Sequence, residues 1–427
     1  MKNKLNKIVA FVIGISVMCG SIVPTFAIDI TQNMNIVTNI QTQANQKPVL
    51  TLDDAIKSAI SISEILSLDE KKISYTDKIN DVDEKIDDNP QLVGKAEIEM
   101  PDDMKDLNED TRDIKLKQCT QQRDFDEDKL IQKVTTDYNN IVTSQMKIDK
   151  IKKDIELKNK DLSITKVKNE VGSTISVDVD ANSILLEDLQ DKLKSNESAL
   201  KDAQYSFKVL TGKDVTQYSL EQDIKFDKFK IDGSVDEYVD NAIENYLKYT
   251  TQIVGLNKDY FNDSDHKVDE IKDEEKPSDS KPTLDATSDL AAYEQYSTKL
   301  DLYYQERYVY AFKLSTRLAY LNAKFGTYES ETNLNEAKKQ FKEQLRNFYT
   351  MLTTTEDNIN LLKKNIVLNN KQLGISKVKY DAELITKIDY DHQVVNSEDL
   401  DIQLRSAIDR YNTLREEIQK PWIAFSK

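Results

Sequence analysis

The sequence predicts an all-α fold with little or no β structure, built from two tandem copies of a long antiparallel coiled-coil hairpin joined by flexible acidic linkers. Three observations lead to this fold class. Apolar residues recur every seven positions over long stretches, the second half of the chain repeats the first, and helix breakers are scarce, with 9 Gly and 7 Pro in 427 residues. With 32% charged residues, the composition is typical of long helices that have one apolar stripe and a solvated outer face.

The first 27 residues have the features of a secretory signal peptide. A start with three lysines precedes an apolar run at 8–17, and small residues ending at Ala27 supply a cleavage site. The run is shorter than the roughly 20 residues that a membrane-spanning helix needs. Cys19 leaves a lipoprotein site open as an alternative, which the bulky Met18 before it disfavours. We therefore expect an exported protein whose mature chain begins with a polar segment at 28–49.

The charge and cysteine content restrict the partners of the mature chain. Residues 1–27 hold three Lys and no acid, so their removal changes the net charge from −17 to −20. This charge disfavours nucleic acid and anionic membranes as partners. Cys119 is the one cysteine after residue 27, so an intrachain disulfide framework is excluded and helix packing must supply the stability.

An internal duplication sets the architecture. Residues 134–193 align without a gap to residues 345–404 at an offset of 211, and 20 of the 60 pairs are identical. Coiled-coil composition alone produces chance matches, but an ungapped run through a predicted turn favours duplication. The predicted repeats are 50–233 and 234–427.

Each repeat also has a matching start, at an offset of 183. Thr51 with Asp54 and Ser234 with Glu237 resemble helix-opening capping boxes. The second repeat is therefore 28 residues longer between its start and its long helix. The segment 262–289 supplies this length, and its acidic, Pro- and Ser-bearing composition predicts a flexible linker.

The seven-residue repeat predicts coiled-coil packing of the long helices. In each repeat five apolar residues recur every seven positions before the predicted turn: Val134, Ile141, Ile148, Ile155 and Leu162, then Leu345, Leu352, Ile359, Ile366 and Leu373. A helix from about 110 to 170 would be about 90 Å long. Such a helix cannot bury its stripe alone, so we expect it to pack against its returning partner and against neighbouring chains.

The two predicted turns lie at equivalent positions. The first consists of Val171, Gly172, Ser173 and Thr174, and its glycine supplies the left-handed geometry of a tight reversal. The second consists of Ala382, Glu383, Leu384 and Ile385, so it must form without glycine. Thr386 with Asp389 then resembles the cap of a new helix.

At these residues the chain resembles the TolC-like outer-membrane efflux factors, a family of two-repeat α-helical tube proteins. Val171 to Val179 resembles the hairpin tip of that family followed by its returning helix, and Leu384 to Asp389 is the matching element in the second repeat. Leu52 to Ile60 resembles the opening helix. The resemblance covers about 50–427 in order, apart from the acidic insertions.

The resemblance implies a homotrimer whose hairpins form a hollow tube, through which substrates pass without chemical change. It implies docking of a periplasmic-type adaptor of an inner-membrane transporter at the tips, through Val171, Gly172, Ser173, Thr174, Glu383, Leu384, Ile385 and Thr386. It also implies an acidic constriction formed by Asp178, Asp180, Asp389 and Asp391. A carboxylate ring concentrates cations and repels anions. The alternative is that these acids stabilise helix N-termini, and one residue can do both.

The chain departs from the family where each repeat should contribute two membrane strands. Such a strand needs about 9–11 residues of alternating apolar character, whereas the first junction offers three apolar residues, Ala96, Ile98 and Met100, between glutamates. Ile224, Phe226, Phe229 and Ile231 lie between the repeats, which suits a belt around a tube. We therefore expect the usual β-barrel strands to be missing. The location stays open between an outer membrane, by resemblance, and an extracytoplasmic site in a single-membrane organism.

The sequence predicts no catalytic, cofactor or metal site. His266 and His392 have no second His or Cys at metal-ligand spacing, so solvated side chains are expected. Residues 210–213 resemble a phosphate loop, but the resemblance is only superficial, because the first glycine of that motif is missing. The tyrosines between 293 and 320 are expected in helix packing or an interface, with a ligand surface as the less favoured alternative. Cys119 is expected to be a packed or idle thiol.

Three functions are compatible with the sequence to different degrees. The first is an exit duct of an envelope transporter. The second is an exported coiled-coil scaffold or surface protein that keeps the fold without transport. The third, an envelope hydrolase, has no motif in its favour.

Overall fold

The computed structural model describes residues 47–93, 96–277, 279–284 and 289–425. The predicted signal peptide at 1–27 and most of the polar segment at 28–49 lie outside these residues. The described chain divides into two compact units. The hairpin unit contains 47–68, 123–246 and 340–425, and the α7 unit contains 69–122 and 247–339. Each unit draws on both predicted repeats, and the proposed repeat boundary at 233/234 stays a prediction.

The first repeat begins with α2 (Leu52–Ile62) and α3 (Glu64–Asp87), followed by the long α4 (Asp102–Glu170) and the returning α5 (Ser176–Thr211). The hydroxyl of Thr51 accepts a hydrogen bond from the backbone N–H of Asp54 at 3.1 Å, as predicted for a helix cap. A short 3₁₀ turn, η2 (Val215–Gln217), follows α5.

The second repeat has the same order of four main helices. It begins with α6 (Val235–Tyr246) and α7 (Lys248–Asn262), passes a 3₁₀ turn, η3 (Asp273–Glu275), and continues into α8 (Leu290–Asp381), α9 (Lys387–Gln419) and the short α10 (Trp422–Phe425). The Ser234 hydroxyl accepts a hydrogen bond from the backbone N–H of Asp236 at 3.2 Å. It therefore caps the start of α6 through Asp236, whereas the sequence predicted a capping box with Glu237.

The strands of the described residues are short, which confirms the expected all-α class. β1 (Val49–Leu50) pairs in parallel with β4 (Ser219–Leu220), and β2 (Gln91–Val93) pairs antiparallel with β3 (Ala96–Ile98). None of the helices in the described ranges has an apolar stretch of the length and hydropathy that crossing a bilayer requires.

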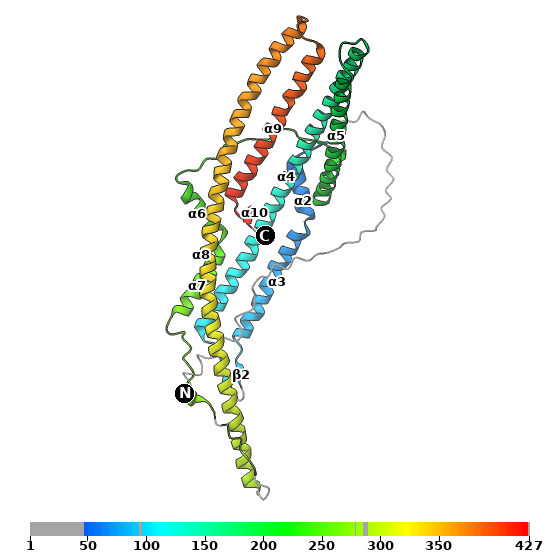
Figure 1. The fold of residues 1–427 in the computed structure, drawn as a ribbon. Helices are drawn as coiled ribbons and strands as arrows, with labels where there is room; N and C mark the ends of the chain where they lie inside the picture. The colour runs from blue at the N-terminus through cyan, green and yellow to red at the C-terminus, as the bar shows by residue number, and fades with distance from the viewer. Residues whose placement is uncertain (1–46, 94–95, 278, 285–288, 426–427) are drawn as a thin grey trace. The chain divides into compact units, whose positions relative to one another are not determined.

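The hairpin unit consists of two hairpins side by side, α4 with α5 and α8 with α9, so that the helices follow one another in the order α5, α4, α9, α8 (Figure 1). The heptad positions farthest from the tips form the cores: Val134, Ile141, Ile148, Leu345, Leu352 and Ile359 are all buried. The opening helices also correspond, because α2 packs on α5 as α6 packs on α9. The predicted seven-residue seams are therefore the contact surfaces of the hairpins.

The segment between the repeats, 221–231, runs extended along the hairpin unit without forming a strand. Ile224, Phe226 and Phe229 pack against the α8–α9 core. Its backbone is held by side chains of the hairpins: the Tyr411 hydroxyl accepts from the N–H of Phe229 at 2.7 Å, and Asn412 donates to the carbonyl of Lys225 at 2.9 Å. The residues predicted as a belt thus lie across α9, fixed by side chains rather than by sheet pairing.

A buried polar cluster joins the two hairpins. Arg405 on α9 donates to the amide oxygen of Asn139 on α4 at 2.9 Å, and the amide nitrogen of Asn139 donates to a carboxylate oxygen of Asp409 at 2.7 Å. Arg405 also donates to the carbonyl of Gln222 in the belt segment. Burial lowers the pKa of the Arg405 guanidinium and raises the pKa of the Asp409 carboxyl. This cluster therefore ties α4, α9 and the belt segment to one geometry.

In the α7 unit, the segment that follows α7 lies along α8. Arg317 donates to the carbonyl of Val268, Lys313 binds Glu275 at 2.7 Å and Arg307 binds Asp279 at 3.0 Å. The acidic segment predicted as a flexible linker is therefore attached to α8 at its described residues. The acids that suggested disorder in the sequence are the partners of basic residues on that helix.

His266 lies in the same segment. The sequence predicted a solvated side chain at this position, and the structure shows that this prediction was wrong. Its ring stacks on Tyr260 with 4.0 Å between centroids, and its two nitrogens lie 3.0 Å from the Tyr260 carbonyl oxygen and 3.3 Å from an Asp103 carboxylate oxygen. Burial raises the pKa of the Tyr260 phenol to about 12. The imidazole thus links the segment after α7 to the first turn of α4.

Candidate functional site: the hairpin tips

The first tip closes α4 with a left-handed residue at Gly172, which has a φ of 73°. The N–H of Gly172 donates to the carbonyl of Asn169 at 3.0 Å, and the N–H of Ser173 donates to the carbonyl of Lys168 at 2.7 Å. This pair of hydrogen bonds is the Schellman motif, which satisfies the last carbonyls of a helix. The reversal falls where the glycine predicted it.

The second tip forms the same motif without glycine. Glu383 has a φ of 57°, and its N–H donates to the carbonyl of Tyr380 at 2.9 Å. The N–H of Leu384 donates to the carbonyl of Lys379 at 2.8 Å. A side chain at positive φ costs roughly 1–2 kcal/mol. The two tips therefore have one backbone shape, 211 residues apart, and the second is strained.

The strain predicts opposite responses to substitution at the two tips. We expect Glu383→Gly to stabilise the second hairpin by about 1 kcal/mol and Gly172→Ala to destabilise the first by a similar amount, because only glycine adopts positive φ without a steric cost. Hydrogen exchange of the amides at 168–174 and 379–385 would measure both effects. Equal responses at the two tips would contradict the assigned geometry.

One acid of the second tip, Asp389, belongs to a helix cap, whereas α5 at the first tip has no side-chain cap. At the second tip the Thr386 hydroxyl accepts from the N–H of Asp389 at 3.2 Å, and the Asp389 carboxylate accepts from the N–H of Thr386 at 3.2 Å, which forms the predicted capping box. The hydrogen bonds from Thr386 lower the pKa of the Asp389 carboxyl. At the first tip Thr174 donates to the carboxylate of Asp178.

The lowered pKa of Asp389 gives a testable pH dependence. Its stabilising effect is present above the ordinary value of 3.8 and is lost as the pH falls through the lower folded value. We expect Asp389→Ala to destabilise the second hairpin at neutral pH, with a difference from the unchanged protein that disappears in acid. Asp180→Ala is the control, because it removes the same charge from a residue that takes no part in a helix cap. A deficit that persists below the folded pKa would contradict the capping role.

The other two acids of the predicted constriction, Asp180 and Asp391, lie two residues after Asp178 and Asp389. Asp391 forms an ion pair with Lys387 at 3.1 Å, four residues earlier on α9. Asp180 on α5 has an exposed side chain, and the residue four positions before it is Ser176 rather than a lysine. The two repeats therefore present unequal charge near their tips.

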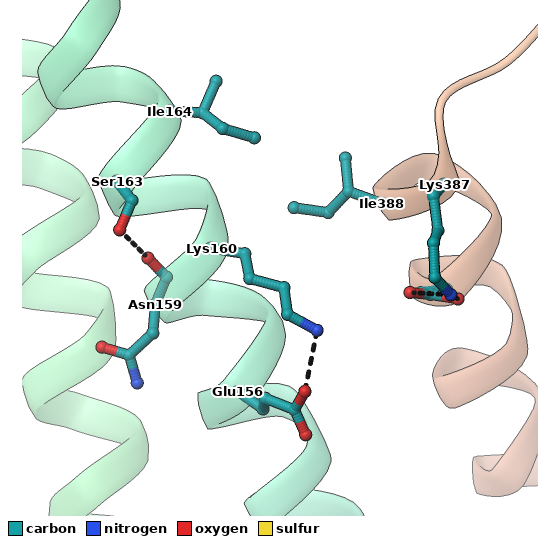
Figure 2. Close-up of a pocket in the computed structure, with 8 residues that line it drawn as sticks. Glu156, Asn159, Lys160, Ser163, Ile164, Lys387 and Ile388 are labelled. Atoms are coloured by element: carbon teal, nitrogen blue, oxygen red, sulfur yellow. Dashed lines mark hydrogen bonds and ion pairs between the residues drawn. The ribbon is translucent and has the colours of Figure 1, made fainter.

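A groove lies between α4 and α9 next to the tips. Figure 2 shows Ile164 and Ile388 directed into it from opposite sides, above the ion pairs of Lys160 with Glu156 and of Lys387 with Asp391. Asn159 and Ser163 complete its wall on α4. The groove thus offers a partner an apolar strip flanked by charged side chains of both hairpins. The sequence did not single it out, because nothing in the pattern tells which helices face one another.

Ion pairs connect the two hairpins along this contact. Lys153 binds Glu398 at 2.6 Å, Lys150 binds Asp399 at 3.4 Å, and the imidazole of His392 lies 3.1 Å from Asp161. His392 was expected to be solvated, but its half-exposed ring bridges the hairpins. Heptad flanks of opposite charge are the signal that could have suggested these contacts.

Both tips expose apolar side chains. Val171, Ile175, Val177 and Leu384 are each well exposed. Because an exposed apolar cluster bordered by polar residues marks a contact surface more often than a monomer surface, the tips are the candidate site for binding another protein.

The described chain contains no cluster of three or more His, Cys, Asp or Glu side chains arranged to hold a metal ion. Gly212, in the segment that resembles a phosphate loop, is the left-handed C-cap of α5 with a φ of 70°. Cys119 is a free, partly buried thiol 3.9 Å from the Thr76 hydroxyl, in agreement with a packed residue.

The tyrosines of α8 divide between packing and exposure. Tyr320 is buried in the α7 unit, whereas Tyr293, Tyr304 and Tyr308 are exposed. The guanidinium of Arg307 lies over the ring of Tyr303 at 4.7 Å. The exposed tyrosines lie on the surface of one helix, and their predicted interface role stays a prediction.

Comparison with known proteins identifies the fold. No protein-family model and no curated protein sequence matches the chain. Among solved structures, the outer-membrane channel OprN matches with a TM-score of 0.53 at 11% identity, covering 87% of this chain and 90% of that one. The CmeC outer membrane channel of Campylobacter jejuni matches with a TM-score of 0.52 at 13% identity, covering 87% and 85%.

The outer membrane protein VceC of Vibrio cholerae matches with a TM-score of 0.50 at 10% identity, covering 86% of this chain and 96% of that one. The order of the repeats, the paired tips and these structural matches lead to one conclusion: the chain has the fold of the TolC-like outer-membrane efflux channels.

Proposed function

We propose that this chain is a passive duct component of an envelope export system, which assembles as a homotrimeric helical tube. The observation that carries the proposal is the equivalence of the two tips. One chain presents two hairpins that end side by side in the same Schellman turn, 211 residues apart. Three copies would then place six similar tips around one opening.

The tips are the proposed docking site of a periplasmic-type adaptor that connects the duct to an inner-membrane transporter. The exposed apolar residues Val171, Ile175 and Leu384 and the groove beside Ile388 supply contact surface for the helical hairpin of such an adaptor. Energy would come from the transporter, because a tube of this kind needs no chemistry of its own.

The proposed constriction rests mainly on Asp180 and Asp391. Asp178 accepts a hydrogen bond from the Thr174 hydroxyl, Asp389 is engaged in the capping box of α9, and Lys387 offsets the charge of Asp391. We expect multivalent cations to slow passage through the assembled duct by binding these carboxylates. The double variant Asp180→Asn with Asp391→Asn should relieve that block.

The decisive experiment measures the native mass of the mature protein, alone and with candidate adaptors. We expect a trimer that binds an adaptor, and we expect Val171→Glu with Leu384→Glu to abolish adaptor binding while the trimer persists. Glu170→Gln, next to the first tip, is the control. A trimer that binds no adaptor would favour the scaffold function, and a stable monomer would contradict the duct.

A further inference from the structure

The contact between the two hairpins within one chain has a regular pattern. On α4, Lys153, Leu157 and Asp161 are four residues apart, and on α9, Glu398, Val395 and His392 are three apart. Residues spaced by three or four share one face of a helix. The ion pair of Lys153 with Glu398 lies at one end of this pattern, and the His392–Asp161 contact lies at the other. Leu157 and Val395 occupy the matching positions between them.

The duplication carries this pattern to the outer helices. At the offset of 211, Lys153 corresponds to Lys364 and Leu157 to Leu368, both on α8. In the same way Glu398 corresponds to Glu187 and Val395 to Ile184, both on α5. The lysine, leucine and glutamate are identical between repeats, and the fourth position keeps a β-branched apolar residue.

Burial is the property that differs between the two sets. Leu157 is 4% exposed while Leu368 is 56% exposed, and Val395 is 7% exposed while Ile184 is 65% exposed. Lys364 and Glu187 are exposed as well. Within the hairpin unit α5 and α8 are the two outer helices (Figure 1). The duplicated chain thus repeats its internal contact surface on faces that the described residues of a single copy leave uncovered.

We propose that α8 of one copy docks onto α5 of a second copy, with an ion pair of Lys364 with Glu187 and an apolar contact of Leu368 with Ile184. The second copy is the occupant because the two faces are complementary in charge and reproduce both sides of the contact inside the chain. The interface joins two different surfaces, so copies add head to tail and a ring can close. The proposal rests on the tubular assembly and assigns the residues that form it.

The contact between copies should differ from the internal one in its charged residues. Lys150, which binds Asp399 inside the chain, corresponds to Leu361, and Asp399 corresponds to Asp188. Asp188 is bound by Lys192 at 2.6 Å on its own helix. The Asp161–His392 pair corresponds to Gln372 and Ala181. One ion pair therefore replaces two ion pairs and a histidine–aspartate contact, so the ring should separate between copies before the hairpins of one chain separate.

An independent observation in the α7 unit supports a second copy as the partner. α3 contacts α4 through its polar side: Asn80 donates to the Arg112 carbonyl at 3.4 Å, and Arg112 binds Asp87. Its apolar residues at coiled-coil spacing face outward instead: Tyr75, Ile79, Val82 and Ile86 are exposed. A helix that packs by its polar side and exposes its apolar stripe requires a further apolar partner.

α8 shows the same inversion in that unit. Its inward residues Thr316, Tyr320 and Thr327 are buried, whereas a more apolar stripe at spacings of three and four faces outward: Leu314, Leu318, Leu321, Phe325 and Tyr328. The exposed stripes of α3 and α8 are both seams of the coiled-coil kind. Pairing of these seams between copies would remove both stripes from water.

A charge exchange tests the interface. We expect Glu187→Lys and Lys364→Glu each to weaken self-association about tenfold or more through like-charge contact, and the double variant to restore it, as measured by sedimentation across a concentration series. Lys152 binds Glu197 within one hairpin at 3.2 Å, so Lys152→Glu with its exchange partner Glu197→Lys is the matched control and should leave assembly unchanged. Circular dichroism would confirm that each variant keeps its helix content.

The outcomes separate this proposal from the duct itself. If both single variants form the same trimer as the unchanged protein at the same concentrations, the assigned interface is wrong while the duct stands. If the single variants weaken assembly but the double variant does not restore it, the Lys364–Glu187 pair is overturned. If the unchanged protein is monomeric throughout, both proposals fall.

Discussion

Arg405→Ala is expected to destabilise the hairpin unit by about 2–4 kcal/mol, because it leaves the Asn139 amide oxygen and the Gln222 carbonyl without their donor and removes the cation near the half-buried Asp409 carboxylate. Arg405 is buried between α4 and α9, where it donates to Asn139 and to the carbonyl of Gln222. Its removal leaves Asp409 in a site whose burial already raises the pKa of that carboxyl. Urea unfolding at neutral pH would measure the loss of unfolding free energy.

The sign of the pH dependence follows from Asp409. A carboxyl whose folded pKa lies above its unfolded value favours the folded state when protonated, so the deficit of Arg405→Ala should shrink as the pH falls through the folded pKa. Arg405→Met combined with Asp409→Asn should recover much of the lost stability, since neither charge is then buried.

The duplication supplies a matched control. Lys194 occupies the position equivalent to Arg405 but is exposed on α5, so Lys194→Ala should change the unfolding free energy by no more than about 0.5 kcal/mol. Equal effects of the two substitutions would contradict the role of the buried cluster.

Tyr138→Phe is expected to cost about 2–4 kcal/mol, although it removes a single oxygen atom. The buried Tyr138 hydroxyl donates to the carbonyl of Leu50 at 2.7 Å and accepts from the N–H of Glu221 at 2.8 Å. Both backbone groups would lose this partner near the β1–β4 pair. We expect faster hydrogen exchange at 219–221 and earlier proteolysis of the belt segment.

Tyr349 is the repeat equivalent of Tyr138 and provides the comparison. It is half-buried in the α8–α9 core, and its hydroxyl makes no hydrogen bond to the described residues. Tyr349→Phe should therefore be nearly neutral, within about 0.5 kcal/mol. A large effect of Tyr349→Phe, or none of Tyr138→Phe, would show that the hydroxyl contacts do not hold the belt.

Periodicity and turn chemistry were sufficient to predict most of the fold. The seven-residue seams, the reversal at Gly172 and the capping box at Thr386 depend on residues close together in sequence, so local rules apply to them. The ungapped duplication then located the second reversal at Glu383 even though no glycine marks it. The adaptor and constriction roles of these tips stay predictions, because the partners that define them are other chains.

The sequence failed where a side chain's role depends on a distant helix. His266 and His392 were predicted to be solvated, because neither has a second His or Cys at metal-ligand spacing. In the structure each lies beside an aspartate of α4. The acidic segment after α7 was predicted to be a flexible linker. Its basic partners are on α8, so the local sequence pattern does not reveal them.

By itself, the sequence determined two equivalent hairpins, their reversals and the helical class, since apolar spacing and backbone geometry act within a few residues. Only the tertiary structure decided that α4 faces α9, that Arg405 is buried rather than solvated, and that α3 turns its apolar stripe outward. The physical reason is that a charged or apolar residue has no fixed environment until helices distant in sequence are placed against one another, and an apolar pattern shows that a face must be covered without showing by what.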